Sequence, residues 1–208
     1  MANLVIFGFG GHARSVANVA LFQGYENIIF VESTAKPGEN FLGHRVVPNF
    51  EEIDISWKFA HPSSGDGIKR KAQCEQITEL GLTLVSVISP SASIGVGSTI
   101  ANGSFLGHMS HVGPMARIGA GCILNTGSVV EHECTVGDYT HISVNSTMAG
   151  RSRIGERCML GAGSVVIDGI SIANGVTIGA GAGVSLDIVE PGTYVGVTAK
   201  NVRSVSCG

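Results

Sequence analysis

The sequence is poor in charged residues, which occupy 14% of its 208 positions, against roughly 25% in a typical soluble domain. Its 13 Lys and Arg residues are outnumbered by 16 Asp and Glu residues, giving a formal net charge of −3. We therefore expect no nucleic-acid partner, because there is no excess of basic residues to bind phosphates. Aromatic residues reach only 6% against 44% hydrophobic residues, so the core must be mainly aliphatic.

Long hydrophobic runs and paired cysteines are also lacking. The longest apolar stretches, such as 27–31, are far shorter than the roughly 20 residues that cross a bilayer, so we expect no membrane partner. No basic segment precedes the apolar residues of the N-terminus, and we expect no signal peptide. The five cysteines include no Cys-x-x-Cys pair, which argues against a zinc ribbon or a disulfide framework and favours a reducing, cytoplasmic location.

The first 86 residues alternate between short apolar runs and helical patterns. The expected order is a strand at 4–7, a helix at 11–23, a strand at 28–31, a loop at 36–43, a strand at 57–60, a helix at 68–80 and a strand at 83–87. This alternation predicts a small parallel α/β domain. It is too short for the full six-stranded dinucleotide-binding fold.

From residue 88 onward, an aliphatic residue recurs at every sixth position. The register is unbroken through Ile88, Ile94, Ile100, Leu106, Val112, Ile118, Leu124, Val130, Val136, Ile142, Met148, Ile154, Leu160, Val166, Ile172, Ile178 and Val184. The position four residues later is nearly always small, and glycine often follows the aliphatic residue. Such a six-residue period indicates a hexapeptide β-helix, in which the aliphatic residues stack into a continuous core. Three cysteines, Cys122, Cys134 and Cys158, occupy the small-residue position, so we interpret them as core residues rather than metal ligands.

A glycine-rich segment, Gly8-Phe-Gly10-Gly11-His12-Ala13, joins the first predicted strand to the first helix. It matches the G-x-G-x-x-G/A pattern, whose backbone N–H groups can bind a phosphate or diphosphate. Glu32 follows the second strand, where an acidic residue could bind a ribose or a base edge. The alternative is a tight turn that only requires glycine, and an NAD dehydrogenase would lack the second half of its fold.

The segment from Asn125 to His141 carries polar and ionisable residues where other repeats have Gly, Ala and Ser. Within it, Glu131, His132 and Glu133 are consecutive. A histidine beside a carboxylate is a candidate general base with an orienting partner. The sequence does not distinguish Glu131 from Glu133 as that partner.

The run 123–134, followed by His141 and by 148–150, resembles the bacterial nucleotide-sugar acetyltransferases of the left-handed β-helix superfamily, as do the glycine-rich loop and the closing segment 192–200. The resemblance is nearest to the bacillosamine-pathway UDP-4-amino-sugar N-acetyltransferases, with sialic-acid O-acetyltransferases and perosamine N-acetyltransferases as relatives. It implies a small Rossmann-like α/β domain at 1–86 that binds a nucleotide-sugar. It further implies a left-handed parallel β-helix of hexapeptide repeats at 87–208, with 18 residues per coil.

The same resemblance implies an acetyl-CoA-dependent reaction without a metal. His132 would be the general base, Glu133 its carboxylate partner and Asn125 a positioning residue. The residues implied for acetyl-CoA are His141, Gly150, Ala162 and Ala180. Those implied for the nucleotide-sugar are Gly10, Gly11, His12, Glu32 and Ser33.

The sequence departs from the family in three places. Glu32-Ser33 replaces two acidic residues, the loop at 60–67 is longer, and Thr198 replaces a proline. The expected function is N-acetylation of a nucleotide-linked, UDP-type amino-deoxysugar for surface glycan synthesis. The alternatives are O-acetylation of a sugar such as sialic acid, a zinc lyase of the γ-carbonic-anhydrase kind, and a non-catalytic binding β-helix. The zinc alternative is disfavoured because no two solenoid histidines are 18 residues apart.

The spacing of the candidate residues also predicts an oligomer. On an 18-residue coil, His132 and His141 are nine residues apart and lie on opposite sides. Asn125 and His141 are 16 apart, close to one full coil, and lie on one wall. We therefore expect a homotrimer of parallel solenoids with active sites between its subunits.

Overall fold

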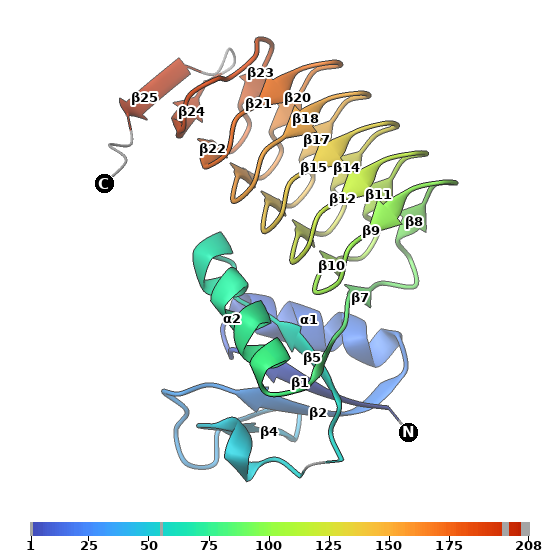
Figure 1. Ribbon diagram of the computed structural model, residues 1–208, viewed down its shortest axis with the longest axis vertical. Coiled ribbons are helices and arrows are strands. Elements are labelled where there is room, and N and C mark those ends of the chain that lie inside the picture. Colours follow the sequence, from blue (N-terminus) through green and yellow to red (C-terminus); the bar gives the residue numbers. More distant parts are fainter. Residues whose placement is uncertain (1, 55, 197–199, 205–208) are drawn as a thin grey trace.

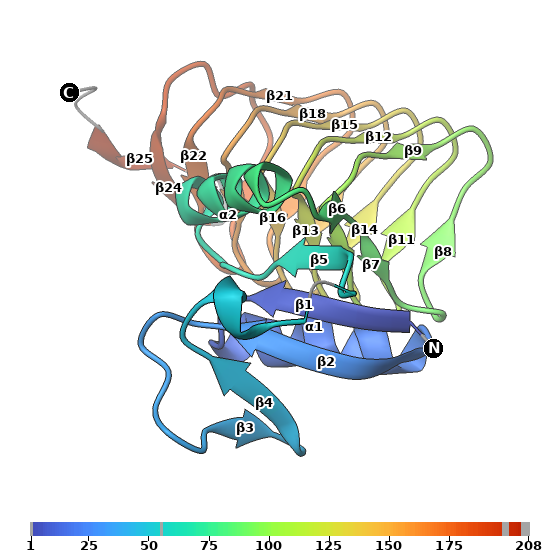
Figure 2. The same ribbon diagram turned by 60° about the horizontal axis from the view of Figure 1, so that its bottom comes forward.

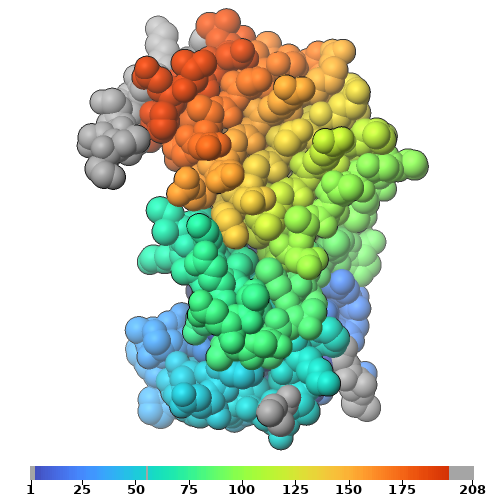
Figure 3. Space-filling view, in the orientation of Figure 1, coloured from blue at the N-terminus to red at the C-terminus, as the bar shows by residue number. Residues whose placement is uncertain are grey.

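The computed structural model describes residues 2–54, 56–196 and 200–204. Its N-terminal α/β part packs against one end and one side of a long parallel β-solenoid (Figure 1). The space-filling view shows the coils following one another in chain order away from the α/β part (Figure 3). Thr198 lies outside the described residues.

The α/β part is a six-stranded sheet in the order β3-β4-β2-β1-β5-β6, in which only the β3–β4 pair is antiparallel. Its strands are β1 (Ala2–Phe7), β2 (Tyr25–Val31), β3 (Asn40–Phe41), β4 (His44–Val47), β5 (Phe59–Pro62) and β6 (Thr83–Leu84). Its helices are α1 (Gly11–Phe22), α2 (Gly67–Glu79) and the 3₁₀ turn η1 (Phe50–Glu52). The two long helices cover opposite faces of the sheet (Figure 2).

Alternation along β1 explains this layering. Leu4 and Ile6 pack under α1, whereas Val5 and Phe7 pack under α2. The predicted order of strands and helices is confirmed except at β3, which lies inside the predicted loop, and at β4, which was not predicted. Both are short edge strands with mainly exposed side chains, so they lack a strong hydrophobic signal.

The solenoid has three flat faces, and its strands pair with strands 18 residues away, as Phe105 does with Ile123. Face 1 contains β7 (Val87–Ile88), β10 (Phe105–Leu106), β13 (Ile123–Leu124), β16 (His141–Ile142), β19 (Met159–Leu160), β22 (Val176–Ile178) and β24 (Gly192–Val195), with antiparallel β25 (Lys200–Ser204) at its end. Face 2 contains β8 (Ser93–Ile94), β11 (His111–Val112), β14 (Val129–Val130), β17 (Thr147–Met148), β20 (Val165–Val166) and β23 (Gly183–Val184). Face 3 contains β9 (Thr99–Ile100), β12 (Arg117–Ile118), β15 (Thr135–Val136), β18 (Arg153–Ile154) and β21 (Ser171–Ile172).

The aliphatic positions of the repeat form the solenoid core, as predicted. They are buried from Leu106 through Val184, whereas Ile94 in the first coil is 47% exposed because no coil lies beneath it. Cys122 is buried in the small-residue position, and its thiol donates to the carbonyl of Gly137 on the next coil at 3.2 Å. Burial raises the pKa of this thiol to about 12. It is therefore a core residue, as the sequence predicts.

Arg70 on α2 joins the α/β part to the solenoid. Its side chain is only 1% exposed, and its guanidinium donates to the carbonyls of Gly121 and Tyr139 on the solenoid. It also donates to Ser64 and Gly65 in the loop before α2. One buried cation thus connects the loop after β5 to two successive coils.

His61 lies near this cation, at the end of β5, and is fully buried. Its Nδ1 lies 2.8 Å from the carbonyl of Val85, while its Nε2 is buried without a partner. Burial lowers the pKa of His61 to about 4, with Arg70 acting in the same direction. The folded protein therefore holds this imidazole neutral.

We predict that His61 makes the fold sensitive to mild acid. The unfolded chain binds a proton at His61 below about pH 6.5, but the folded chain does so only near pH 4. Lowering the pH from 7 to 5 should therefore reduce the free energy of unfolding by about 2 kcal/mol through this residue. His61→Asn, which can still donate to Val85, should reduce that pH dependence in urea denaturation. An undiminished difference between pH 7 and pH 5 would contradict the assignment.

Candidate functional site

A crevice opens where the parallel strands of the α/β sheet end. Gly8 follows β1, Glu32 follows β2 and Ser63 follows β5, and all three line a cavity of about 660 Å³. The chain passes from β1 to β2 on one side of the sheet and reaches β5 on the other side of β1. Such a switch in strand order is where open α/β sheets bind their ligands.

The glycine-rich loop forms one side of this cavity. Gly10 is the N-cap of α1 and has no side chain to bond the first N–H groups. A Cβ atom at Gly10 or Gly11 would meet no protein atom within 4 Å, so neither glycine is required by packing. The loop therefore presents backbone N–H groups and a helix N-terminus to an open space, an arrangement that suits an anion.

The opposite side of the cavity was not predicted from sequence. It consists of the loop after β5 and the first two turns of α2, including Lys69, Ala72 and Gln73. Asp66 caps α2 by accepting from the backbone N–H of Lys69 at 2.9 Å. A helix cap of this kind is common, so the sequence alone did not indicate that Lys69 faces a ligand cavity.

His12 and His141 come together at the boundary between the cavity and the solenoid. Their ring centroids are 6.3 Å apart, and the His12 ring also meets Phe105 edge-on at 4.9 Å. The Nε2 atoms of both histidines are buried without a partner. Burial lowers the pKa of His12 well below its usual value and that of His141 to about 4, and Arg70 adds to both shifts. Two neutral imidazoles thus present unpaired nitrogens side by side.

His132 and Glu133 lie on a different edge of the solenoid, at the corner between faces 2 and 3. The Nδ1 atom of His132 is 3.1 Å from a carboxylate oxygen of Glu133, and both side chains are about half exposed. A Cβ at Gly150 would lie 2.4 Å from the His132 Nε2 atom, so the ring rests directly on this glycine. In this structure Glu133, rather than Glu131, contacts the imidazole.

Asn125, Ala162 and Ala180 occupy the corner between faces 1 and 2, on successive coils. The Asn125 side chain accepts from the N–H of Thr126 at 2.8 Å. Ala162 and Ala180 are exposed, and the glycines that follow each of them have no neighbour within 4 Å of a built Cβ. This corner is therefore a shallow, side-chain-free track that fits an extended pantetheine arm.

The predicted residues consequently form three groups in one chain. Gly10, Gly11, His12 and Glu32 line the crevice, with His141 beside His12. Asn125, Ala162 and Ala180 lie along one edge of face 2. His132, Glu133 and Gly150 lie along its other edge. The width of face 2 therefore separates the candidate base from the other two groups.

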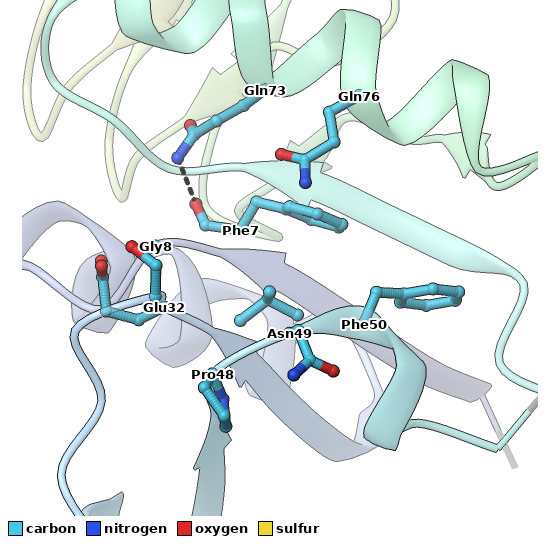
Figure 4. Close-up of a pocket in the computed structure, with 10 residues that line it drawn as sticks. Phe7, Gly8, Glu32, Pro48, Asn49, Phe50, Gln73 and Gln76 are labelled. Carbon is cyan, nitrogen blue, oxygen red and sulfur yellow. Dashed lines mark hydrogen bonds between the residues drawn. The ribbon is translucent and has the colours of Figure 1, made fainter.

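A second, smaller cavity of about 230 Å³ adjoins the crevice (Figure 4). The two cavities share Gly8, Glu32 and Gln73 in their walls. The predicted residue Ser33 lines this second cavity only. One oxygen of Glu32 accepts from the N–H and hydroxyl of Thr34.

The described part of the chain contains no group of three or more His, Cys, Asp or Glu side chains arranged to hold a metal ion. None of its helices is both long and apolar enough to cross a membrane.

Two family models match the chain. Residues 3–64 match the PglD N-terminal domain, and residues 151–185 match the bacterial transferase hexapeptide repeats. The first match covers the glycine-rich loop and the crevice strands, while the second covers the later coils of the solenoid.

Solved structures of similar proteins extend over nearly the whole chain. The acetyltransferase domain of PglB from Neisseria gonorrhoeae is 28% identical, with a TM-score of 0.91 over 97% of this chain and 100% of that one. That domain has also been solved with acetyl coenzyme A, with a TM-score of 0.91 over 96% and 98% of the two chains at 28% identity. PerB from Caulobacter crescentus, in complex with CoA and GDP-perosamine, is 28% identical, with a TM-score of 0.88 over 97% of each chain.

These matches confirm the predicted fold, a small parallel α/β domain followed by a parallel solenoid consistent with a left-handed β-helix. They also agree with the acetyltransferase chemistry that the resemblance implies. The chain joins a PglD-type N-terminal domain to bacterial transferase hexapeptide repeats, and it belongs to the acetyltransferases that are built in this way.

Proposed function

We propose that this protein transfers the acetyl group of acetyl-CoA to the amino group of a nucleotide-linked amino-deoxysugar, with UDP as the nucleotide, for surface glycan synthesis. Residues 1–86 bind the nucleotide-sugar and residues 87–208 carry out the transfer. The observation that carries this proposal is an anion-binding crevice whose inner end is lined by His12, next to His141 of the solenoid. The neighbouring complex with CoA and GDP-perosamine contains ligands of the same two classes.

The chemistry requires a base at the sugar nitrogen. The amine lone pair forms a C–N bond to the acetyl carbonyl carbon, and the nitrogen becomes positively charged. A neutral His132 takes the nitrogen-bound proton, and Glu133 orients the ring and stabilises the resulting imidazolium. The C–S bond then breaks, and CoA leaves as the thiol after taking up a proton. Holding the two large substrates in line supplies much of the remaining rate enhancement.

One chain does not bring these groups together, so we propose a homotrimer. Face 2 separates His132 and Glu133 from Asn125 and His141. A three-fold arrangement of parallel solenoids brings one edge of face 2 against the opposite edge of a neighbouring face 2. Each site then takes His132 from one subunit and the crevice, Asn125 and His141 from the next.

The surface chemistry of the solenoid favours face 2 for this contact. Outward-facing strand residues of face 3 include Arg117 and Arg153, and the first coils of face 1 are covered by α1. Face 2 instead presents Val129 and the 42%-exposed Val165. Its two edges carry further exposed apolar side chains, namely Met109, Met115, Val144 and Ile167. Subunit contacts are commonly built from such uncharged, partly apolar surfaces.

The proposed activity is tested by acetyl transfer to a panel of UDP-, GDP-, dTDP- and CMP-sugars, each with an amino or a hydroxyl group at the acceptor carbon. Release of free CoA thiol reports turnover. We expect transfer to amino-sugars, and acetylation of hydroxyl acceptors alone would favour the O-transferase alternative. The absence of transfer to every acceptor would overturn the proposal.

We predict that His132→Ala folds normally and loses kcat by roughly 10²–10⁴-fold, the usual contribution of a general base. Because the side chain is half exposed and rests on Gly150, its removal leaves no buried cavity. Glu133→Gln should cause a smaller loss, since the amide can still accept a hydrogen bond but carries no charge. Retention of more than about a tenth of the wild-type kcat by His132→Ala would show that His132 is not the base.

We further predict that two inactive variants restore each other's activity in mixed trimers. His132→Ala chains are unfolded and refolded with an equal amount of Ala162→Trp chains, in which the exposed track is blocked. If each site spans two subunits, every mixed trimer has one intact site, and about a quarter of the wild-type activity should return. Activity that stays at background, or a monomer in sedimentation, would contradict the shared site.

A further inference from the structure

The second cavity lies on the α2 side of the sheet, where β1, β2 and β4 end. Its apolar walls come from Phe7, Val31, Pro48 and Phe50. Phe7 and Phe50 both extend toward the space beneath α2 (Figure 4). A narrow cavity with aromatic and aliphatic walls suits a flat, apolar-faced group with a polar edge.

Gln73 and Gln76 are one helical turn apart on α2 and face this region, but they are engaged differently. The Gln73 amide oxygen accepts from the N–H groups of Ser63 and Ser64, and its nitrogen donates to the carbonyl of Phe7. Gln73 therefore ties α2 to the ends of β1 and β5. For Gln76, no hydrogen bond from its side chain is found within the described residues, and its amide points into the cavity from above (Figure 4).

Two other polar groups are available at the same end of the cavity. Asn49 follows β4 on the wall opposite Gln76, and Ser33 follows Glu32 after β2. The Asn49 amide nitrogen makes one long contact of 3.5 Å with Glu52, which leaves its oxygen free among the described contacts. Glu32, by contrast, lines both cavities and so stands at their junction.

We propose that the nucleobase of the substrate occupies this second cavity, that Gln76 and Asn49 read its edge, and that the base is uracil rather than guanine. The proposal rests on the proposed function, since it takes the larger crevice to hold the diphosphate. In that arrangement Glu32 meets the ribose hydroxyls at the junction of the two cavities. The base then lies between the apolar walls, with its polar edge toward the two amides.

The hydrogen-bonding groups decide between the two bases. Guanine has two adjacent donors, N1–H and the N2 amino group, which are best matched by a carboxylate or by two acceptors. Among the described residues that line the second cavity, Glu32 is the sole carboxylate, and it lies at the ribose junction. A side-chain amide has one donor and one acceptor, which matches the neighbouring carbonyl and N3–H of uracil. Guanine would leave one of its donors without a partner, and such a loss strongly disfavours binding.

The test measures binding of free UDP, CDP, GDP and ADP to the full-length protein by calorimetry, alongside acetyl transfer to UDP- and GDP-linked amino-sugars. We expect UDP to bind at least about tenfold more tightly than GDP. Gln76→Glu, which replaces the amide by two acceptors, should weaken UDP by about tenfold or more and narrow or reverse the preference over GDP. Gln76→Leu should weaken UDP without any gain for GDP.

Two control variants separate base reading from general effects. Glu79→Gln alters an exposed residue one turn further along α2, outside both cavities, and should leave nucleotide affinities unchanged. Gly11→Val places a side chain in the open space at the phosphate end and should weaken all four nucleotides alike.

Each outcome bears on the inference in a different way. Tighter binding of GDP, CDP or ADP than of UDP by the unchanged protein would overturn it while leaving acetyl transfer intact. Equal UDP affinity in Gln76→Glu, Gln76→Leu and the unchanged protein would overturn the assignment of Gln76. Failure to bind any nucleotide, together with no acetyl transfer, would overturn the proposed function itself.

Discussion

Stacking of one 18-residue coil on the next determines where every solenoid side chain lies. Because the strands of each face pair at this spacing, residues 18 apart share a column. His132, Gly150 and Asp168 form one such column, and Ala162 and Ala180 belong to another. The buried aliphatic register enforces the stacking, since a shift by one residue would turn the core side chains outward. The distance between the two halves of the proposed site is therefore set by the width of one face, and the second half has to come from a neighbouring chain.

The position of the nucleotide crevice depends on a different contact, the buried Arg70. Its donors are satisfied by carbonyls of the solenoid and of the loop that lines the crevice. A buried guanidinium left without acceptors is strongly unfavourable, so displacing the α/β part from the coils would be costly. The same positive charge disfavours protonation of His12 and His141. One residue thus positions the crevice against the solenoid and helps to keep the imidazoles at its inner end uncharged.

Local patterns in the sequence were enough to predict much of this architecture. The six-residue register identified the solenoid core and the buried cysteines, because both follow from neighbours at fixed sequence spacing. Lys69, Arg70 and Gln76 were not predicted, because their surroundings come from distant segments. Arg70, for example, meets carbonyls 51 and 69 residues away. Glu131 and Glu133 could not be distinguished from sequence, since both flank His132, and only the conformation of the corner places Glu133 in contact with the ring.

That corner conformation links backbone strain to the site. Glu133 has a φ angle of +58° at a corner position that many other coils fill with glycine. A left-handed conformation costs a non-glycine residue about 1–2 kcal/mol, so a side chain there must be retained against a stability cost. Six other solenoid corners carry such a side chain, namely Met109, Met115, Tyr139, Asn145, Arg151 and Arg157.

These strained corners all lie between residues 109 and 157, in the coils that carry the candidate base and the apolar edges of face 2. The following coils have glycine at the equivalent positions, beginning with Gly163. Glycine there removes both the strain and the side chain, and so leaves the edge open beside Ala162 and Ala180. The solenoid thus bears strain in the coils where side chains are needed for chemistry and for subunit contact. It avoids strain where the acetyl-CoA arm requires a smooth surface.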